Sequence, residues 1–177
     1  QDFITSNHRG HGQSIAMEID LNGMMAEIMG KATGTCKGKG GSMHIADLDN
    51  GNLGANGIVG GGMGMAIGAA LTQKMKNTGK IVLCCFGDGA CNEGTFHETL
   101  NLASIWKLPV IFYSINNFYG ISTPIKNVIN VDYNYQRASA YGIPGHFIED
   151  GNGVDLLREV EHRIDGLVDL AVLPQVK

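Results

Sequence analysis

The sequence predicts an α/β fold with a mainly parallel sheet, and two observations support it. The first is a strand–helix–strand pattern: an apolar run over residues 81–86, helical apolar spacing over residues 93–106, and a second apolar run over residues 109–115. The second is that polar residues follow both runs, Asp88 within a Gly-Asp-Gly turn and Asn117 beyond the other. A right-handed crossover brings the carboxyl ends of both strands to one edge of the sheet, where open α/β sheets bind ligands. We therefore expect Asp88 and Asn117 to face each other.

The other elements follow from similar patterns in chain order. Residues 15–29 have helical apolar spacing, with Glu18 and Glu27 expected outside, so we predict a core-facing amphipathic helix. Its inward side chains are expected to be Met17, Leu21, Met24, Met25 and Ile28. Towards the end of the chain we predict a helix over residues 134–141, a short strand over 147–149, a helix over 154–168 and a last strand over 170–176.

Composition limits the classes of function. The 177 residues are 44% hydrophobic and have a mean hydropathy near zero, so we expect a single domain over residues 1–177, truncated at both ends. A net charge of −4 gives no electrostatic basis for binding nucleic acid or an anionic membrane. The sequence shows neither a signal peptide nor an apolar run of membrane-spanning length. The four cysteines lack zinc or disulfide spacing, so the cytoplasm is the expected compartment.

Glycine is unusually abundant. The 26 glycines occur in clusters, which indicates loops that approach a ligand closely. Small residues at helical spacing also allow a close helix–helix approach, either between subunits or within one chain. These residues are Gly60, Gly64, Gly68 and Ala69.

The polar residues at the strand ends fit a metal ion together with a diphosphate. The Asp88 carboxylate and the Asn117 amide oxygen are hard ligands of the kind that Mg²⁺ takes while keeping positions for phosphate oxygens. Gly89 and Ala90, small residues before a predicted helix, would let backbone N–H groups approach the phosphates. The planar guanidinium of Arg9 matches phosphate oxygens in a bidentate manner.

Gly-Asp-Gly followed, after residues 90–115, by two asparagines resembles the motif of the thiamine diphosphate-dependent enzymes. The resemblance implies a three-layer α/β/α thiamine diphosphate-binding fold, with thiamine diphosphate and Mg²⁺ as cofactors. It also implies that the carbonyl of Tyr119 is the third protein ligand of the metal, beside Asp88 and Asn117.

Other segments resemble the alpha subunits of the 2-oxo acid dehydrogenases. The segment His-Arg-Gly-His-Gly is most similar to the acetoin dehydrogenase branch and implies phosphate contacts from His8 and Arg9. Gly-Lys-Gly-Gly-Ser-Met-His resembles the segment whose histidine lies in the active-site channel, which implies a catalytic role for His44. Gly57 and Val59 match positions that contact the aminopyrimidine ring. At residue 115 the chain has isoleucine where the family usually has glutamate.

The same resemblance implies a reaction and partners. Acetoin would be cleaved to acetaldehyde, and the hydroxyethyl unit left on the cofactor would pass to lipoamide or another acceptor; pyruvate or another 2-oxo acid is the alternative substrate. This chain offers no obvious glutamate for the pyrimidine nitrogen. The resemblance assigns that glutamate to a beta subunit in an α2β2 heterotetramer, with a lipoyl-bearing acyltransferase as a possible further partner.

Three other interpretations of the sequence are possible. Residues 34–44 contain glycines and lysines but lack the ending of a nucleoside triphosphate loop, and no clear strand precedes them. A nicotinamide-binding domain needs glycines directly after a strand, and residues 60–64 follow no convincing strand. A structural or interaction module without enzymatic activity remains open on sequence alone.

Overall fold

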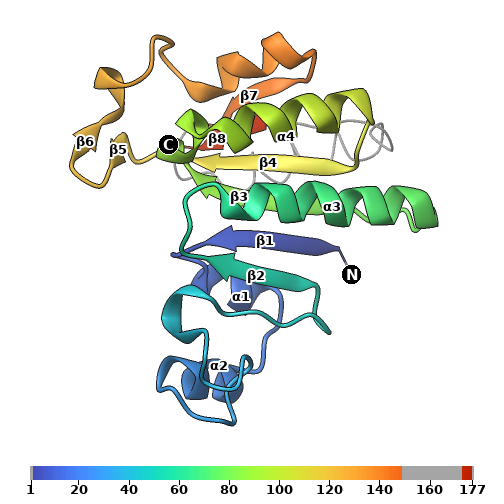
Figure 1. Ribbon diagram of the computed structural model, residues 1–177, viewed down its shortest axis with the longest axis vertical. Helices are drawn as coiled ribbons and strands as arrows, with labels where there is room; N and C mark the ends of the chain where they lie inside the picture. The colour runs from blue at the N-terminus through green and yellow to red at the C-terminus, as the bar shows by residue number, and fades with distance from the viewer. Residues whose placement is uncertain (1, 149–172, 177) are drawn as a thin grey trace.

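The computed structural model describes residues 2–148 and the backbone of residues 173–176, and its centre is a parallel sheet (Figure 1). Six strands lie in the order β2-β1-β3-β4-β8-β7, and every neighbouring pair is parallel. The strands are β1 (Phe3–Asn7), β2 (Asn52–Asn56), β3 (Val82–Gly87), β4 (Val110–Ile115), β7 (Gly145–Ile148) and β8 (Leu173–Val176). The predicted helix over residues 154–168 lies outside the described residues, as do the first positions of the predicted last strand.

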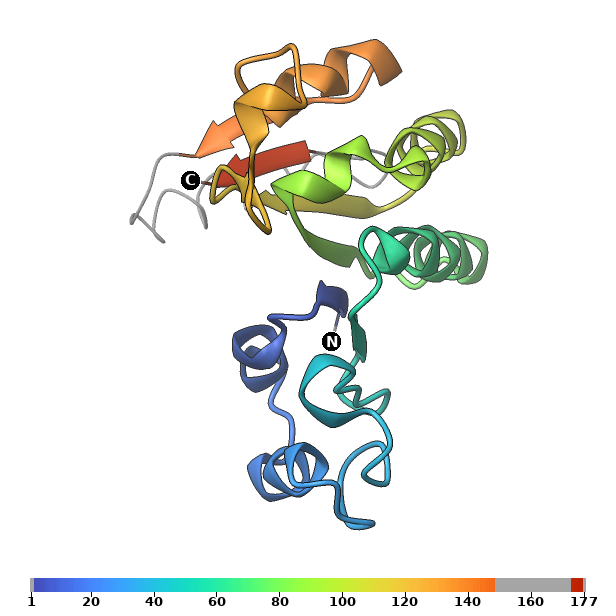
Figure 2. The same cartoon turned by 60° about the vertical axis from the view of Figure 1, so that its left-hand side comes forward.

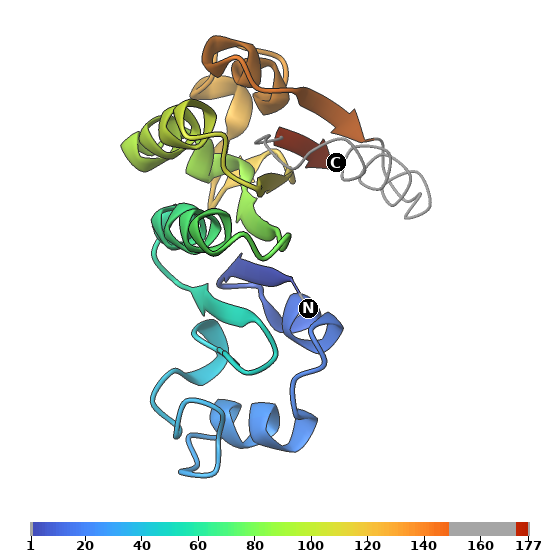
Figure 3. The same cartoon turned by 90° about the vertical axis from the view of Figure 1, so that its right-hand side faces the viewer.

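Helices pack on both faces of this sheet. The α-helices of the described residues are α1 (His11–Ala16), α2 (Leu21–Ile28), α3 (Gly61–Lys76) and α4 (Gly94–Ile105). Figures 2 and 3 show α3 and α4 along one face and α1 on the other, whereas α2 and the loop after it extend beyond the β2 edge. Among the described residues, no helix combines the length and apolarity that crossing a membrane requires.

The predicted strand–helix–strand unit is confirmed as β3, α4 and β4. Its side chains form the centre of the core, where Phe86 and Phe96 meet edge to face with ring centroids 6.1 Å apart and Phe112 is fully buried. The register pairs Val82 with Val110 and continues to Gly87 opposite Ile115. The residues that follow both strands therefore lie at one edge of the sheet, as predicted.

The single helix predicted over residues 15–29 is wrong. Asp20 interrupts it, because its carboxylate accepts hydrogen bonds from the backbone N–H groups of Asn22 (3.2 Å) and Gly23 (2.8 Å) and so caps α2. The orientation is also wrong, since Glu27 is fully buried while Met25 is 57% exposed. Leu21 and Ile28, which were also expected inside, are exposed as well. Periodicity failed here because the carboxylate of Glu27 binds backbone groups inside the fold.

Other predictions need smaller corrections. Strand β2 ends at Asn56, shortly before the glycines at residues 60–64, so the expectation that no strand precedes them is wrong. The helix predicted over residues 134–141 is confirmed with the same bounds, as the 3₁₀ helix η4, and Gly142 ends it with φ of +67°. A Cβ added to Gly64 or Gly68 would meet no atom within 4 Å, so the described part of the chain does not use these glycines for close helix packing.

Candidate functional site

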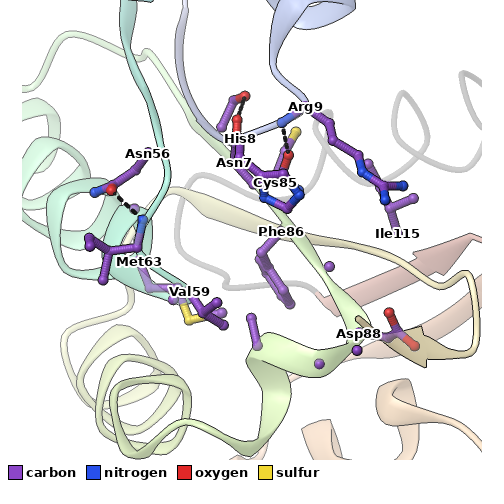
Figure 4. Close-up of a pocket in the computed structure, with 18 of the residues that line it drawn as sticks. Asn7, His8, Arg9, Asn56, Val59, Met63, Cys85, Phe86, Asp88 and Ile115 are labelled. Carbon is purple, nitrogen blue, oxygen red and sulfur yellow. Dashed lines mark hydrogen bonds between the residues drawn. The ribbon is translucent and has the colours of Figure 1, made fainter. Parts of the chain in front are cut away.

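A cavity of about 430 Å³ opens at the carboxyl ends of the central strands (Figure 4). It is bounded by the end of β1, the turn from β2 to α3, the end of β3 with the following 3₁₀ turn η2 (Asp88–Asn92), and the chain after β4. This is the edge at which open parallel sheets bind ligands. The lining residues are 6–9, 13, 56, 58–60, 62–63, 84–90, 115, 117 and 119–121.

Most of the residues singled out from the sequence meet in this cavity. Those lining it are His8, Arg9, Val59, Asp88, Gly89, Ala90, Asn117 and Tyr119. Gly57 and His44 are not among the lining residues. They lie next to each other, since a Cβ on Gly57 would be 3.1 Å from Nε2 of His44. The missing side chain of Gly57 therefore leaves room for the His44 imidazole.

Asp88 is the one carboxylate among the described residues that line the cavity. It is only 2% exposed, and its Oδ2 has no hydrogen-bond partner among the described residues. Burial raises the pKa of the carboxyl above its ordinary value, and the nearby backbone N–H groups of Asp88, Gly89, Asn117 and Phe118 offset this only in part. A buried carboxylate with an unused oxygen is stabilised by a bound cation, so this observation fits a metal ligand.

The chain after β4 brings Asn117 and Tyr119 to the wall of the cavity. Asn117 accepts a hydrogen bond from the backbone N–H of Tyr119 (3.1 Å), and Phe118 between them has φ of +64°. This turn leads into the antiparallel hairpin of β5 (Tyr119–Gly120) and β6 (Thr123–Pro124). No group of three His, Cys, Asp or Glu side chains in the described residues could hold a metal. One carboxylate, an amide and a carbonyl instead fit Mg²⁺ that keeps positions for phosphate oxygens.

Gly89 and Ala90 precede a helix, as predicted, and both line the cavity. They lie within the 3₁₀ turn η2, and α4 begins at Gly94, close to its predicted start. The N-terminus of α3 also borders the cavity, where Gly60 adopts φ of +73° and the first turn has no side-chain cap. Its macrodipole favours an anion.

Arg9 brings a guanidinium group to the wall of the cavity. Its backbone N–H donates to Oδ1 of Asn7 (2.9 Å), which fixes the turn after β1. Figure 4 shows its side chain extending toward Ile115, which also lines the cavity. Because residue 115 is isoleucine, that side chain places no carboxylate in this part of the wall.

Sequence reasoning missed several lining residues. Asn56 accepts a hydrogen bond from the backbone N–H of Ile58 (2.8 Å) and so forms the turn between β2 and α3. The Asn-Gly pair at residues 56 and 57 was a usable turn signal. Gln13 and Met63 also line the cavity, but nothing in their sequence context distinguishes them from ordinary helical residues.

Comparison with known proteins defines the class of fold first. A transketolase from Pichia stipitis matches 99% of this chain and 28% of its own, with a TM-score of 0.70 and 17% identity. A transketolase from Leishmania mexicana matches equal shares with a TM-score of 0.69 and 19% identity. The predicted α/β thiamine diphosphate-binding fold is confirmed.

The family is defined by sequence. The model of the family "Dehydrogenase E1 component" matches residues 1–158, and the chain belongs to this family. The acetoin:2,6-dichlorophenolindophenol oxidoreductase alpha subunit of Bacillus subtilis is 57% identical over 93% of this chain, and that of Cupriavidus necator 53% over 81%. The pyruvate dehydrogenase E1 alpha subunit of Rhizobium meliloti is 36% identical over 95% of this chain. The chain spans 49%, 43% and 47% of these three relatives, respectively, or about half their length.

Proposed function

We propose that this chain is part of the alpha subunit of a thiamine diphosphate-dependent acetoin dehydrogenase. The observation that carries the proposal is the identity of 57% and 53% to alpha subunits of acetoin oxidoreductases, against 36% to a pyruvate dehydrogenase alpha subunit. The alternative substrate is pyruvate or another 2-oxo acid, because the residues of the cavity would hold the same cofactor in either enzyme.

The chemistry belongs to the cofactor. When bound, thiamine diphosphate would supply a nucleophilic carbon and an electron sink for cleavage of the carbon–carbon bond of acetoin, which releases acetaldehyde. The remaining two-carbon unit would pass to lipoamide, whose disulfide would take up two electrons, or would be oxidised by another electron acceptor.

The protein holds and orients this cofactor. Asp88, Asn117 and the Tyr119 carbonyl hold Mg²⁺, and the unused Oδ2 of Asp88 supports this assignment. Arg9 and His8, with the backbone of Gly89 and Ala90, would hold the diphosphate.

The rest of the cofactor site is assigned to the turn after β2. Val59 lines the cavity and Gly57 lies beside the His44 imidazole, so we assign both to the aminopyrimidine side. His44 is assigned to proton transfer near the substrate, since an imidazole side chain can both donate and accept a proton.

The complete enzyme is proposed to need a second chain. Asp88 is the one carboxylate among the lining residues that the structure describes, so a glutamate for the pyrimidine nitrogen has to come from elsewhere. We assign it to a beta subunit in an α2β2 heterotetramer, with a lipoyl-bearing acyltransferase as a further partner. The cysteines of the described residues are free thiols, which is typical of the cytoplasm.

The test is consumption of acetoin against pyruvate by the complete alpha subunit mixed with its beta subunit. The assay contains thiamine diphosphate, Mg²⁺ and dichlorophenolindophenol as electron acceptor. A higher kcat/KM for acetoin is expected. A higher value for pyruvate would move the enzyme to the 2-oxo acid branch, and turnover of neither substrate would contradict the proposal.

A further inference from the structure

The glycine-rich loop between α2 and His44 encloses the side-chain carboxylate of Glu27. We propose that Glu27 is a positioning residue: its carboxylate locks residues 36–41 into one conformation and thereby sets the location of His44 beside the cavity. The claim that the lock affects the catalytic role of His44 rests on the proposed function. The claim that Glu27 holds the loop in one conformation does not.

The contacts are made by both carboxylate oxygens. Oε2 of Glu27 accepts the backbone N–H groups of Cys36 (2.8 Å) and Gly38 (2.7 Å). Oε1 accepts those of Gly40 (2.7 Å) and Gly41 (3.0 Å). Backbone N–H groups converging on one point form an anion-binding nest, which in other proteins takes phosphate. Here the fully buried side chain of Glu27 fills it.

The glycines are needed because the loop wraps so closely. A Cβ on Gly34 would lie 2.5 Å from Cα of Glu27, and one on Gly38 would lie 2.6 Å from the carbonyl carbon of Gly30. Gly38 and Gly41 also have positive φ, at +74° and +61°. The glycine content that resembled a phosphate loop is thus explained by the enclosure of Glu27.

The lock is connected directly to His44. Cys36, whose N–H binds Glu27, also places its Sγ 3.4 Å from the backbone oxygen of His44. Gly40 packs against the same residue, since a Cβ there would lie 2.5 Å from the His44 carbonyl oxygen. On the other side, Nε2 of His11 lies 3.0 Å from Oγ of Ser42 and 3.1 Å from its carbonyl oxygen. The loop is therefore held by contacts with Glu27 and with His11 of α1, and it leads directly into His44.

The charge on Glu27 is favoured by the same contacts. Burial opposes ionisation of the carboxyl, but the backbone N–H groups of Gly38, Gly41, Cys36 and Gly40 outweigh it, so the pKa lies below its ordinary value. The loop thus binds a carboxylate and not a carboxylic acid. A neutral side chain of equal size cannot replace it, because an amide presents N–H groups to two of the four donors.

The first test measures backbone hydrogen exchange in the assembled enzyme. In Glu27→Gln, the amides of residues 36, 38, 40 and 41 should exchange about tenfold faster or more, with β3 and β4 unchanged. Glu18→Gln is the matched control, because it removes the same charge from an exposed side chain and should change nothing. Unchanged exchange in the loop would overturn the lock, and so would loss of protection in β3 and β4, which would make Glu27 a general core residue.

The second test separates charge from packing. In Glu27→Ala, added formate or acetate should restore slow exchange of the loop amides, and acetamide should not. Equal rescue by acetamide, or none by either anion, would overturn the role of the charge.

The kinetic arm tests the connection to His44. Glu27→Gln should lower kcat for the preferred substrate about tenfold or more, while the affinity for Mg²⁺ and thiamine diphosphate stays within about twofold because the Asp88 side of the cavity is untouched. Accelerated exchange with unchanged kcat would overturn the positioning step alone. Failure of the wild-type enzyme on both acetoin and pyruvate would contradict the proposed function and leave the exchange result valid.

Discussion

At the scale of single residues, Asp88 combines burial with an oxygen that has no hydrogen-bond partner in the described part of the chain. The surrounding N–H groups favour its ionised form but do not fully offset its burial. A cation bound by Oδ2 would supply the missing stabilisation.

Replacing Asp88 with alanine should therefore weaken Mg²⁺-dependent binding of thiamine diphosphate by about 100-fold or more in the assembled enzyme. Calorimetric titration of the cofactor in the presence of Mg²⁺ measures this. Asp132→Ala removes an exposed carboxylate and serves as the control. An unchanged dissociation constant for Asp88→Ala would refute Asp88 as a metal ligand.

The cysteines make a second prediction at this scale. Burial raises the pKa of the Cys84 and Cys91 thiols to about 12 and also raises that of Cys85, whereas Cys36 is partly exposed. Because the thiolate is the reactive form, iodoacetamide at pH 8 should modify only Cys36 in the native protein. Mass spectrometry counts the added groups, and urea should expose all four cysteines. Labelling of Cys84, Cys85 or Cys91 without denaturant would contradict the burial.

At the scale of elements, α2 shows how a buried carboxylate changes which face of a helix is buried. A periodicity argument places Glu27 on the exposed face of the helix, and Met25 is then expected on the buried face. In the structure Glu27 and Met24 are buried, and Met25 is exposed. The helix is oriented by the hydrogen bonds that the following loop donates to Glu27.

This orientation is tested by two neighbouring methionines. Met24→Ala should lower the free energy of unfolding by about 2–5 kcal/mol, because it removes a side chain that is 7% exposed. Met25→Ala, at 57% exposure, should change it by less than about 0.5 kcal/mol. Urea unfolding of both variants gives the comparison. A larger loss for Met25→Ala would restore the helix orientation predicted from the sequence.

At the scale of the whole molecule, the sequence was sufficient for the parallel unit from β3 to β4 and for most cavity residues. Apolar runs bounded by glycine report buried strands directly, and the strand ends then place Asp88 and Asn117. The cap at Asp20 was readable, since aspartate before an apolar run marks a helix start. The nest around Glu27 could not be predicted, because it depends on the directions of backbone N–H groups. The residue types of the loop do not determine these directions.

The cavity also predicts the behaviour of the isolated subunit. Its lining contains one carboxylate among the described residues, Asp88, which is assigned to the metal. Without the beta subunit, the alpha subunit should therefore show no turnover of acetoin, and adding the beta subunit should restore it. Stopped assays of acetaldehyde release measure both conditions. Robust turnover by the alpha subunit alone would contradict the proposal that the beta subunit completes the catalytic site.

The parallel order of the strands also has a consequence for folding. The cavity joins residues from 6 to 121, and its walls meet only when crossovers between β1, β2, β3 and β4 are complete. Such non-local pairing has high contact order and slows folding. Partly folded forms should lack the binding site altogether, so cofactor affinity should appear in one late kinetic phase. Cofactor present during refolding would then act by mass action on the finished fold, slowing its unfolding rather than guiding its formation.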